Sequence, residues 1–73
     1  MTEKQVQILG FEKTKEFCTN HYFTRIYRKG VIDVDFTYES AELVSVYMTL
    51  EEVNCLPINI EELKSLDLII NKK

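Results

Sequence analysis

Two cysteines and one histidine are the residues of this chain best suited to metal or nucleophilic chemistry. Cys18 and His21 are separated by two residues, a spacing at which one loop can present two zinc ligands, and Cys55 could add a third. Glu51 or Glu52 would have to complete the set. A structural zinc site needs four ligands, so three candidates without a dependable fourth do not predict one. A Cys–His nucleophilic pair is also disfavoured, because the sequence marks neither an orienting third group nor an oxyanion site.

Established catalytic motifs are missing from the sequence. It contains no Gly-rich phosphate loop, no HExxH and no GxSxG, and its carboxylates are spaced like those of solvated faces. We therefore expect a protein that is not an enzyme and that uses no metal, cofactor or small-molecule substrate. The two cysteines are expected to be small buried side chains, with a Cys18–Cys55 disulfide as the alternative.

Length and composition indicate one domain spanning residues 1–73, with 45% hydrophobic residues. A chain of this size buries only roughly 60% of its unfolded surface and is marginally stable alone, so self-association is expected. The sequence shows no signal peptide and no apolar run near 18 residues, which predicts a cytoplasmic protein with reduced thiols and no membrane contact.

Aromatic and basic side chains alternate in the segment 21–40, HYFTRIYRKGVIDVDFTYES. These types suit stacking on bases and pairing with phosphates, so the hairpin strand 22–29 is a candidate for single-stranded nucleic-acid binding. Charge argues against that function. Residues 11–30 hold five basic side chains and two acids, but residues 31–71 hold nine acids and one lysine, and Asp33 and Asp35 flank the basic strand. Tyr, Phe and Arg are also enriched at protein interfaces, and this mixture favours docking to a protein.

The elements that would position these residues form an α+β fold. Thr2 and Gln5 have the spacing of a capping box and Gly10 can end a helix, which predicts a short helix at about 3–9. The residues from 13 to 50 are expected to form an antiparallel meander of three to four strands, at about 13–18, 22–28, 31–38 and 43–50. A second helix at about 60–71 is expected to cover one face of the sheet.

The second helix has the clearest sequence signals. Asn59 can cap it, and Glu62 stands at the third helical position. Leu63, Leu66 and Ile70 share one stripe that would face the sheet, whereas Leu68 falls on the opposite side. A single exposed Leu is ordinary on a protein surface. A contact between subunits is the alternative for Leu68.

The turn between the second and third strands decides which side chains face outward. A three-residue loop, Arg28-Lys29-Gly30, requires the left-handed conformation only of Gly30 and is the favoured prediction. It would pair Ile26 with Ile32 and place the candidate interaction residues on the outer face, together with Tyr47 of the fourth strand. Those residues are Phe23, Arg25, Tyr27 and Tyr47. The alternative is a two-residue loop, Lys29-Gly30, which would invert the strand and bury Phe23 and Tyr27.

Three segments resemble small uncharacterised single-domain proteins of bacterial phages and mobile elements: LGFEK, YRKGVIDVDFTYE and IEELKSLD. The likeness spans the chain and implies a product that acts by binding a larger protein. Together with the arguments above, the sequence predicts a non-catalytic protein-protein interaction module that binds a second copy of itself as a homodimer. The alternative function is single-stranded nucleic-acid binding through residues 22–29.

Overall fold

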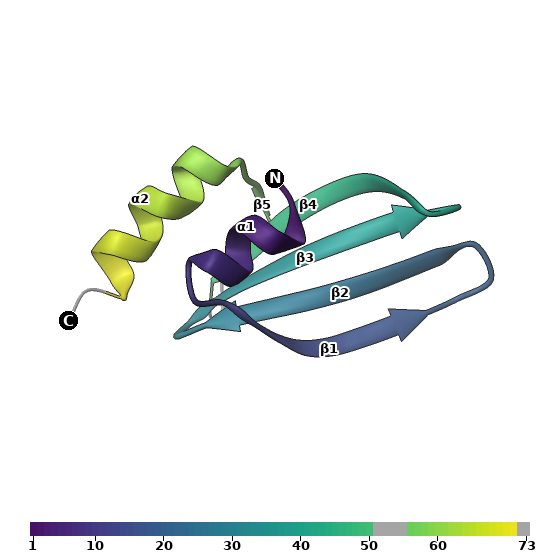
Figure 1. The fold of residues 1–73 in the computed structure, drawn as a ribbon, viewed down its shortest axis with the longest axis horizontal. Coiled ribbons are helices and arrows are strands. Elements are labelled where there is room, and N and C mark those ends of the chain that lie inside the picture. Colours follow the sequence, from purple (N-terminus) through teal and green to yellow (C-terminus); the bar gives the residue numbers. More distant parts are fainter. Residues whose placement is uncertain (51–55, 72–73) are drawn as a thin grey trace.

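The computed structural model describes residues 1–50 and 56–71 (Figure 1). Its elements are α1 (Glu3–Ile8), β1 (Glu12–Cys18), β2 (Tyr22–Lys29), β3 (Ile32–Glu39), β4 (Glu42–Leu50), β5 (Leu56–Pro57) and α2 (Ile60–Ile70). The strands of this described part form one antiparallel sheet in the order β1-β2-β3-β4-β5. The predicted α+β meander with two helices is confirmed, and the two-residue β5 is an addition that the sequence did not predict.

Both helices begin with the capping boxes that the sequence predicts. The Thr2 and Gln5 side chains each accept a hydrogen bond from the other's backbone N–H in α1, and Asn59 and Glu62 do the same in α2. These bonds satisfy backbone donors that a helix start otherwise leaves free. Gly10, at a φ of 99°, follows α1 and directs the chain into β1.

Both helices lie over one face of the sheet (Figure 1). Among the described residues, one hydrophobic core joins them to that face. Its buried residues are Val6, Phe11, Tyr27, Ile32, Val34, Phe36, Met48 and Leu63. The Tyr27 and Phe36 rings meet edge to face, with centroids 5.7 Å apart. Because Val6 of α1 and Leu63 of α2 belong to the same cluster, the two helices form one layer over the sheet.

The hairpin register differs from the favoured prediction. Lys29 pairs with Ile32, so the turn consists of Gly30 and Val31, and the three-residue loop is wrong. Gly30 has a φ of 63°, whereas Val31 is not in the left-handed region. This is the pattern of a type II′ turn with glycine first. The turn lies one residue later than the predicted two-residue alternative, Lys29-Gly30. Both turns place the same β2 side chains on the same face of the sheet, so Tyr27 faces the helices.

Packing explains this register. With Tyr27 opposite Val34, the β2 residue at the core is a large aromatic whose hydroxyl reaches Glu3 of α1. The three-residue loop would instead have placed Ile26 and Thr24 against the helices. Because the turn starts at Gly30, Lys29 belongs to β2 and its side chain lies on the helix face. There it bonds to Leu9, at the end of α1, and to Asp67 of α2.

β4 joins the core over most of its length, in the pairs Val46–Phe36, Met48–Val34 and Leu50–Ile32. Val44 alternates in step with these β4 residues in the sequence, but it does not join the core. The register shifts so that Ser45 pairs with Thr37 and Leu43 with Tyr38, which leaves Val44 as the extra residue of a bulge and 52% exposed.

Candidate protein-interaction surface

Three of the residues predicted on the outer face lie on the helix face instead. Tyr27 is only 3% exposed and belongs to the core, so it presents no docking surface. Phe23 stacks on Tyr38 of β3 with ring centroids 4.6 Å apart. Arg25 lies above both rings, with its guanidinium carbon 4.9 Å from the Phe23 centroid. The aromatic outer surface around these residues is therefore absent, because the strand has the opposite parity.

One carboxylate of α1 collects the polar ends of these side chains. Glu3 accepts hydrogen bonds from the hydroxyl of Tyr27 (2.6 Å), from the hydroxyl of Tyr38, and from Arg25 Nη1 (2.9 Å). Burial alone would raise the pKa of Glu3, but these three donors outweigh it and hold the pKa below the ordinary value of 4.5. Burial, together with the bond to Glu3, raises the pKa of both Tyr27 and Tyr38 to about 12. The network fastens α1 to the sheet.

The basic side chains of the hairpin are each engaged by a carboxylate. Arg25 contacts Glu3, Arg28 Nη1 lies 2.9 Å from Asp33 Oδ2, and Lys29 Nζ lies 2.9 Å from Asp67 Oδ2. Arg25 Nε also lies 3.6 Å from a Glu16 oxygen. Phosphate binding would compete with these pairs, which weakens the case for nucleic acid.

The outer face of the sheet carries no helix and is mainly polar. Tyr47 is 42% exposed there and pairs with Asp35, as predicted for its place on this face. A shallow hollow of about 230 Å³ lies beside it, lined by Thr14, Lys15, Ile26, Arg28, Asp33, Asp35 and Thr49. Burial, and then the neighbouring Asp33 charge, raise the pKa of Asp35. The alternation of core-facing and polar side chains is what an antiparallel sheet with one solvated face requires.

A polar junction brings the C-terminal ends of the two helices together. Lys29 Nζ donates to the Leu9 carbonyl oxygen (2.7 Å) and contacts Asp67 on α2. Asn71 Nδ2 donates to the Lys29 carbonyl oxygen (3.2 Å) and to Asp67 Oδ1 (3.0 Å). Burial opposes ionisation of Asp67, but the Asn71 and Lys29 bonds lower its pKa below the ordinary 3.8. No local sequence pattern predicts this junction, since residues that bond to each other in it are up to 42 positions apart.

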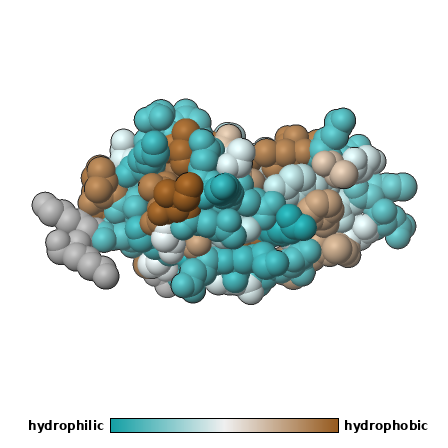
Figure 2. All heavy atoms as spheres, viewed as in Figure 1, coloured by the Kyte–Doolittle hydropathy of each residue, from teal (hydrophilic) through white to brown (hydrophobic). Residues whose placement is uncertain are grey.

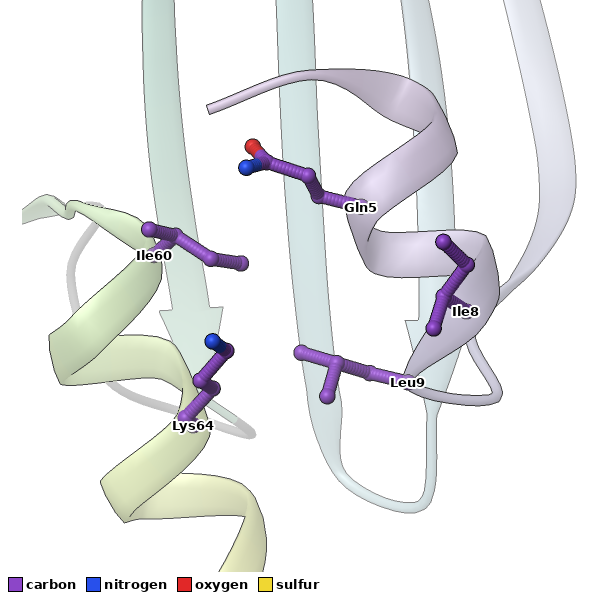
Figure 3. A pocket seen from close by; sticks show the side chains of 5 residues that line it. All are labelled: Gln5, Ile8, Leu9, Ile60 and Lys64. Atoms are coloured by element: carbon purple, nitrogen blue, oxygen red, sulfur yellow. The ribbon is translucent and has the colours of Figure 1, made fainter.

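A cleft of about 170 Å³ separates the helices, lined by Gln5, Ile8, Leu9, Ile60 and Lys64 (Figure 3). Its walls are largely aliphatic, with Gln5 and Lys64 as the polar groups. Nothing in this set resembles a nucleophile, a metal ligand set or an acid–base pair. The cleft suits contact with an apolar side chain better than it suits chemistry.

Large apolar side chains are exposed on both helices. Ile8 of α1 is 74% exposed, and Leu68 and Ile69 of α2 are 72% and 74% exposed. We call these three residues the apolar end. Figure 2 shows apolar surface over the helices on this side of the molecule. Leu68 was singled out from the sequence. Ile8 was missed, although it stands two residues, about 200° of helix, from the buried Val6.

The residues first considered for metal chemistry are not brought together in the described part of the chain. Cys18 is exposed on β1, so its expected burial is wrong. Within residues 1–50 and 56–71, no group of three His, Cys, Asp or Glu side chains could hold a metal ion. Cys55, Glu51 and Glu52 lie outside the described residues, and so does the question of a disulfide.

Neither helix in the described ranges combines the length and apolar character needed to cross a bilayer. We also compared the chain with protein-family models, curated proteins and solved structures, and none of the three comparisons finds a match. Any function must therefore be argued from the surface itself.

Proposed function

We propose that this protein is a non-catalytic protein-protein interaction module that self-associates, and that the helix layer is its contact surface. The observation that carries the proposal is the apolar end, where Ile8, Leu68 and Ile69 are each more than 70% exposed. Ile8 also lines the aliphatic cleft between the helices. Scattered single apolar residues are ordinary, but a group with a polar rim is typical of an interaction site. Lys64 and Gln5 supply part of that rim.

Hydrophobic burial at this end is of the size that a weak dimer needs. Complete burial of one fully exposed Leu or Ile side chain contributes about 1.5–3 kcal/mol, so six such side chains from two copies contribute at most about 18 kcal/mol. The gain is smaller than this limit because each of these side chains is already partly buried. Loss of translational and rotational freedom on association costs about 4–15 kcal/mol. The two amounts are comparable, which favours a reversible dimer over a permanent one.

The edge strand β1 is a poorer route to self-association, although all of its residues are exposed. Its sequence Glu-Lys-Thr-Lys-Glu reads the same in both directions around Thr14. An antiparallel partner centred there would place Glu12 opposite Glu16 and Lys13 opposite Lys15. Like charges directly opposite are destabilising, so this edge is protected in the way that charged edge strands commonly are.

Single-stranded nucleic-acid binding is the second candidate function, since the strand 22–29 holds aromatic and basic side chains. The ion pairs of Arg25, Arg28 and Lys29 count against it. Titration with mixed-sequence oligonucleotides at low salt separates the two functions. We expect no binding signal at any oligonucleotide concentration. A steeply salt-dependent affinity that is lost on replacing these three residues would instead establish the nucleic-acid function.

Light scattering coupled to size-exclusion chromatography, over a concentration series at low and moderate salt, tests the proposal directly. We expect the mass to rise from one chain towards two chains as concentration increases. The dimer should persist at moderate salt, because its main contribution is apolar burial. A mass of one chain at every concentration would contradict self-association.

A further inference from the structure

The two helices cover only one end of the sheet face on which they lie. Lys29 marks that end, because it bonds to Leu9 after α1 and to Asp67 of α2. Neither helix of the described ranges lies over the opposite end, where β2 and β4 begin and β1 and β3 stop (Figure 1). We call that part of the face the bare end. A helix with its side chains is about 10–12 Å thick, so the helix layer stands about that far above the bare end.

A row of mainly apolar side chains crosses the bare end. The strand register pairs Cys18 with Phe23, Phe23 with Tyr38 and Tyr38 with Leu43. Phe23 precedes the core residue Tyr27 by four residues on β2, so the row lies on the helix side of the sheet. Cys18 is exposed, and Leu43 is 41% exposed. Figure 2 shows apolar surface over the helices and again beyond them.

The helix layer presents apolar side chains away from its own sheet. Ile8 lies about 200° of helix from the buried Val6, and Leu68 lies about 140° from the buried Leu63. Ile8 and Leu68 are therefore directed outward, in agreement with their exposed fractions of 74% and 72%. One face of the molecule thus carries two apolar patches, one raised by the helices and the other recessed at the bare end.

We infer that two copies of this chain dimerise face to face about a two-fold axis that crosses the strands, so that the helix layer of each copy covers the bare end of the other. This inference rests on the proposed function and adds the surface that the helix layer contacts. The rotation exchanges the two ends of the face, so each raised part fills the space above a recessed part. Copies that met helix layer to helix layer would leave both bare ends exposed.

The dimensions of the molecule favour contact over the whole face. Its principal extents are 40 × 24 × 19 Å, so its broad face of 40 × 24 Å covers about 960 Å². With 6 and 11 residues, α1 and α2 are short, and their outward surfaces together cover only roughly 300 Å². A stable interface of ordinary size takes about 800 Å² from each partner. The whole face reaches that size, whereas the helix layer alone does not.

The same rotation identifies one contact in particular. Because Asp67 bonds to Lys29, its neighbour Leu68 lies at the covered end of the sheet, whereas Leu43 lies at the bare end. An axis across the strands leaves each element at its lateral position, and α2 lies on the β4 side of α1 (Figure 3). Leu68 of each copy therefore meets Leu43 of the other. Each patch is used once, so assembly stops at two copies.

A double-variant cycle tests this contact. We expect Leu68→Glu alone and Leu43→Lys alone each to weaken the dimer by about tenfold or more, because each change places an unpaired charge in an apolar contact twice per dimer. The combined variant Leu43→Lys/Leu68→Glu should bind at least about fivefold more tightly than the two single losses together predict, since opposite charges then meet. Sedimentation velocity at several concentrations measures these affinities.

Phe17→Lys is the matched control. Phe17 is 54% exposed at the same end of the sheet, but it pairs with Thr24 and lies on the outer face. This change should neither weaken the dimer nor rescue Leu68→Glu. Leu43→Ser removes the apolar contact without adding a charge and should also weaken the dimer. Circular dichroism confirms that each variant is folded.

The outcomes separate this arrangement from the proposed function. Weakening by Leu43→Lys and Leu43→Ser, with recovery in the combined variant, would support contact between the helix layer and the bare end. A dimer that Leu68→Glu weakens but both Leu43 changes leave unaltered, or a combined variant without recovery, would overturn the inference and leave self-association through the helix layer standing. A wild-type monomer at all concentrations would overturn both.

Discussion

The two ends of the sheet are built very differently, and their hairpin turns show the contrast. At the helix end, Gly30 adopts a φ of 63° and lies against the side chain of Asn71, the residue that follows α2. A Cβ atom at Gly30 would lie 2.1 Å from Asn71 Oδ1. At the far end, the β3–β4 turn uses Ser40 and Ala41 at φ values of 51° and 69°. Left-handed backbone is unfavourable for such residues, and the helices do not cover this end (Figure 1).

This contrast shows which end of the sheet is held more firmly by the helices. Lys29, Asp67 and Asn71 fasten both helices to the Gly30 turn. The far end instead exposes Leu43 and Val44 and contains a strained turn. We therefore expect local opening to begin at the far end, while the helix end stays ordered and presents the interaction surface.

Gly30→Ala should produce the largest loss of stability, because it disrupts the turn that both helices hold in place. The new methyl group would require a left-handed alanine and would displace the Asn71 side chain. We expect the free energy of unfolding to fall by at least about 2 kcal/mol, measured by urea denaturation. In the background Asn71→Ala, the same change should cost less. A loss below about 0.5 kcal/mol would show that the turn is not constrained by α2.

Lys29→Met should have the next largest effect. It removes the donor to the Leu9 carbonyl and leaves the mostly buried Asp67 carboxylate without its cation. We expect a loss of about 1–3 kcal/mol in the free energy of unfolding. The matched comparison is Arg28→Met, which breaks an exposed ion pair with Asp33 and should cost at most about 1 kcal/mol. Equal losses would contradict a special role for the junction.

Glu3→Gln tests the network that fastens α1. The folded-state pKa of Glu3 lies below its ordinary value, so its ionised form stabilises the fold at neutral pH, and this contribution is lost as pH falls through the folded-state pKa. We expect a loss of about 1–2 kcal/mol at neutral pH that shrinks under acid conditions. Chemical denaturation over an acid pH series checks this, and a pH-independent difference would contradict it.

The same network makes a prediction at alkaline pH. Tyr27 and Tyr38 should ionise near 12, and the stability that their neutral forms supply should be lost as pH rises from 10 through about 12. Near-ultraviolet absorbance follows tyrosinate formation. Tyr27→Phe and Tyr38→Phe should each remove one late-titrating group, and an unchanged late phase would contradict the assignment.

Ala41→Gly should have the smallest effect and the opposite sign. Glycine adopts left-handed backbone without steric cost, so the variant should gain up to about 1 kcal/mol in the free energy of unfolding. Ser45→Gly, in the middle of β4, is the control and should lose stability. A loss in both variants, measured by thermal unfolding, would mean that the far turn is not strained.

Sequence reasoning succeeded where the signals are local. Thr2 with Gln5 and Asn59 with Glu62 form the predicted caps, and Leu68 is exposed as its helical position indicates. It failed for Tyr27, because the hairpin parity depends on partners that lie far away in the sequence. Glu3 is 24 residues from Tyr27, and Asp67 is 38 residues from Lys29. The residue types at Lys29-Gly30 are compatible with more than one hairpin register. Contacts with residues far away in the sequence decide which register forms.

Self-association through the helix layer is tested by comparing two surfaces that the sequence analysis proposed as contacts. Leu68→Ser removes an exposed apolar group from the helix layer, and Tyr47→Ser removes one from the outer face of the sheet. Sedimentation equilibrium of both variants measures the dimer dissociation constant. We predict that Leu68→Ser converts the dimer largely to monomer while Tyr47→Ser leaves it unchanged. Loss of the dimer with Tyr47→Ser, and its retention with Leu68→Ser, would contradict the account.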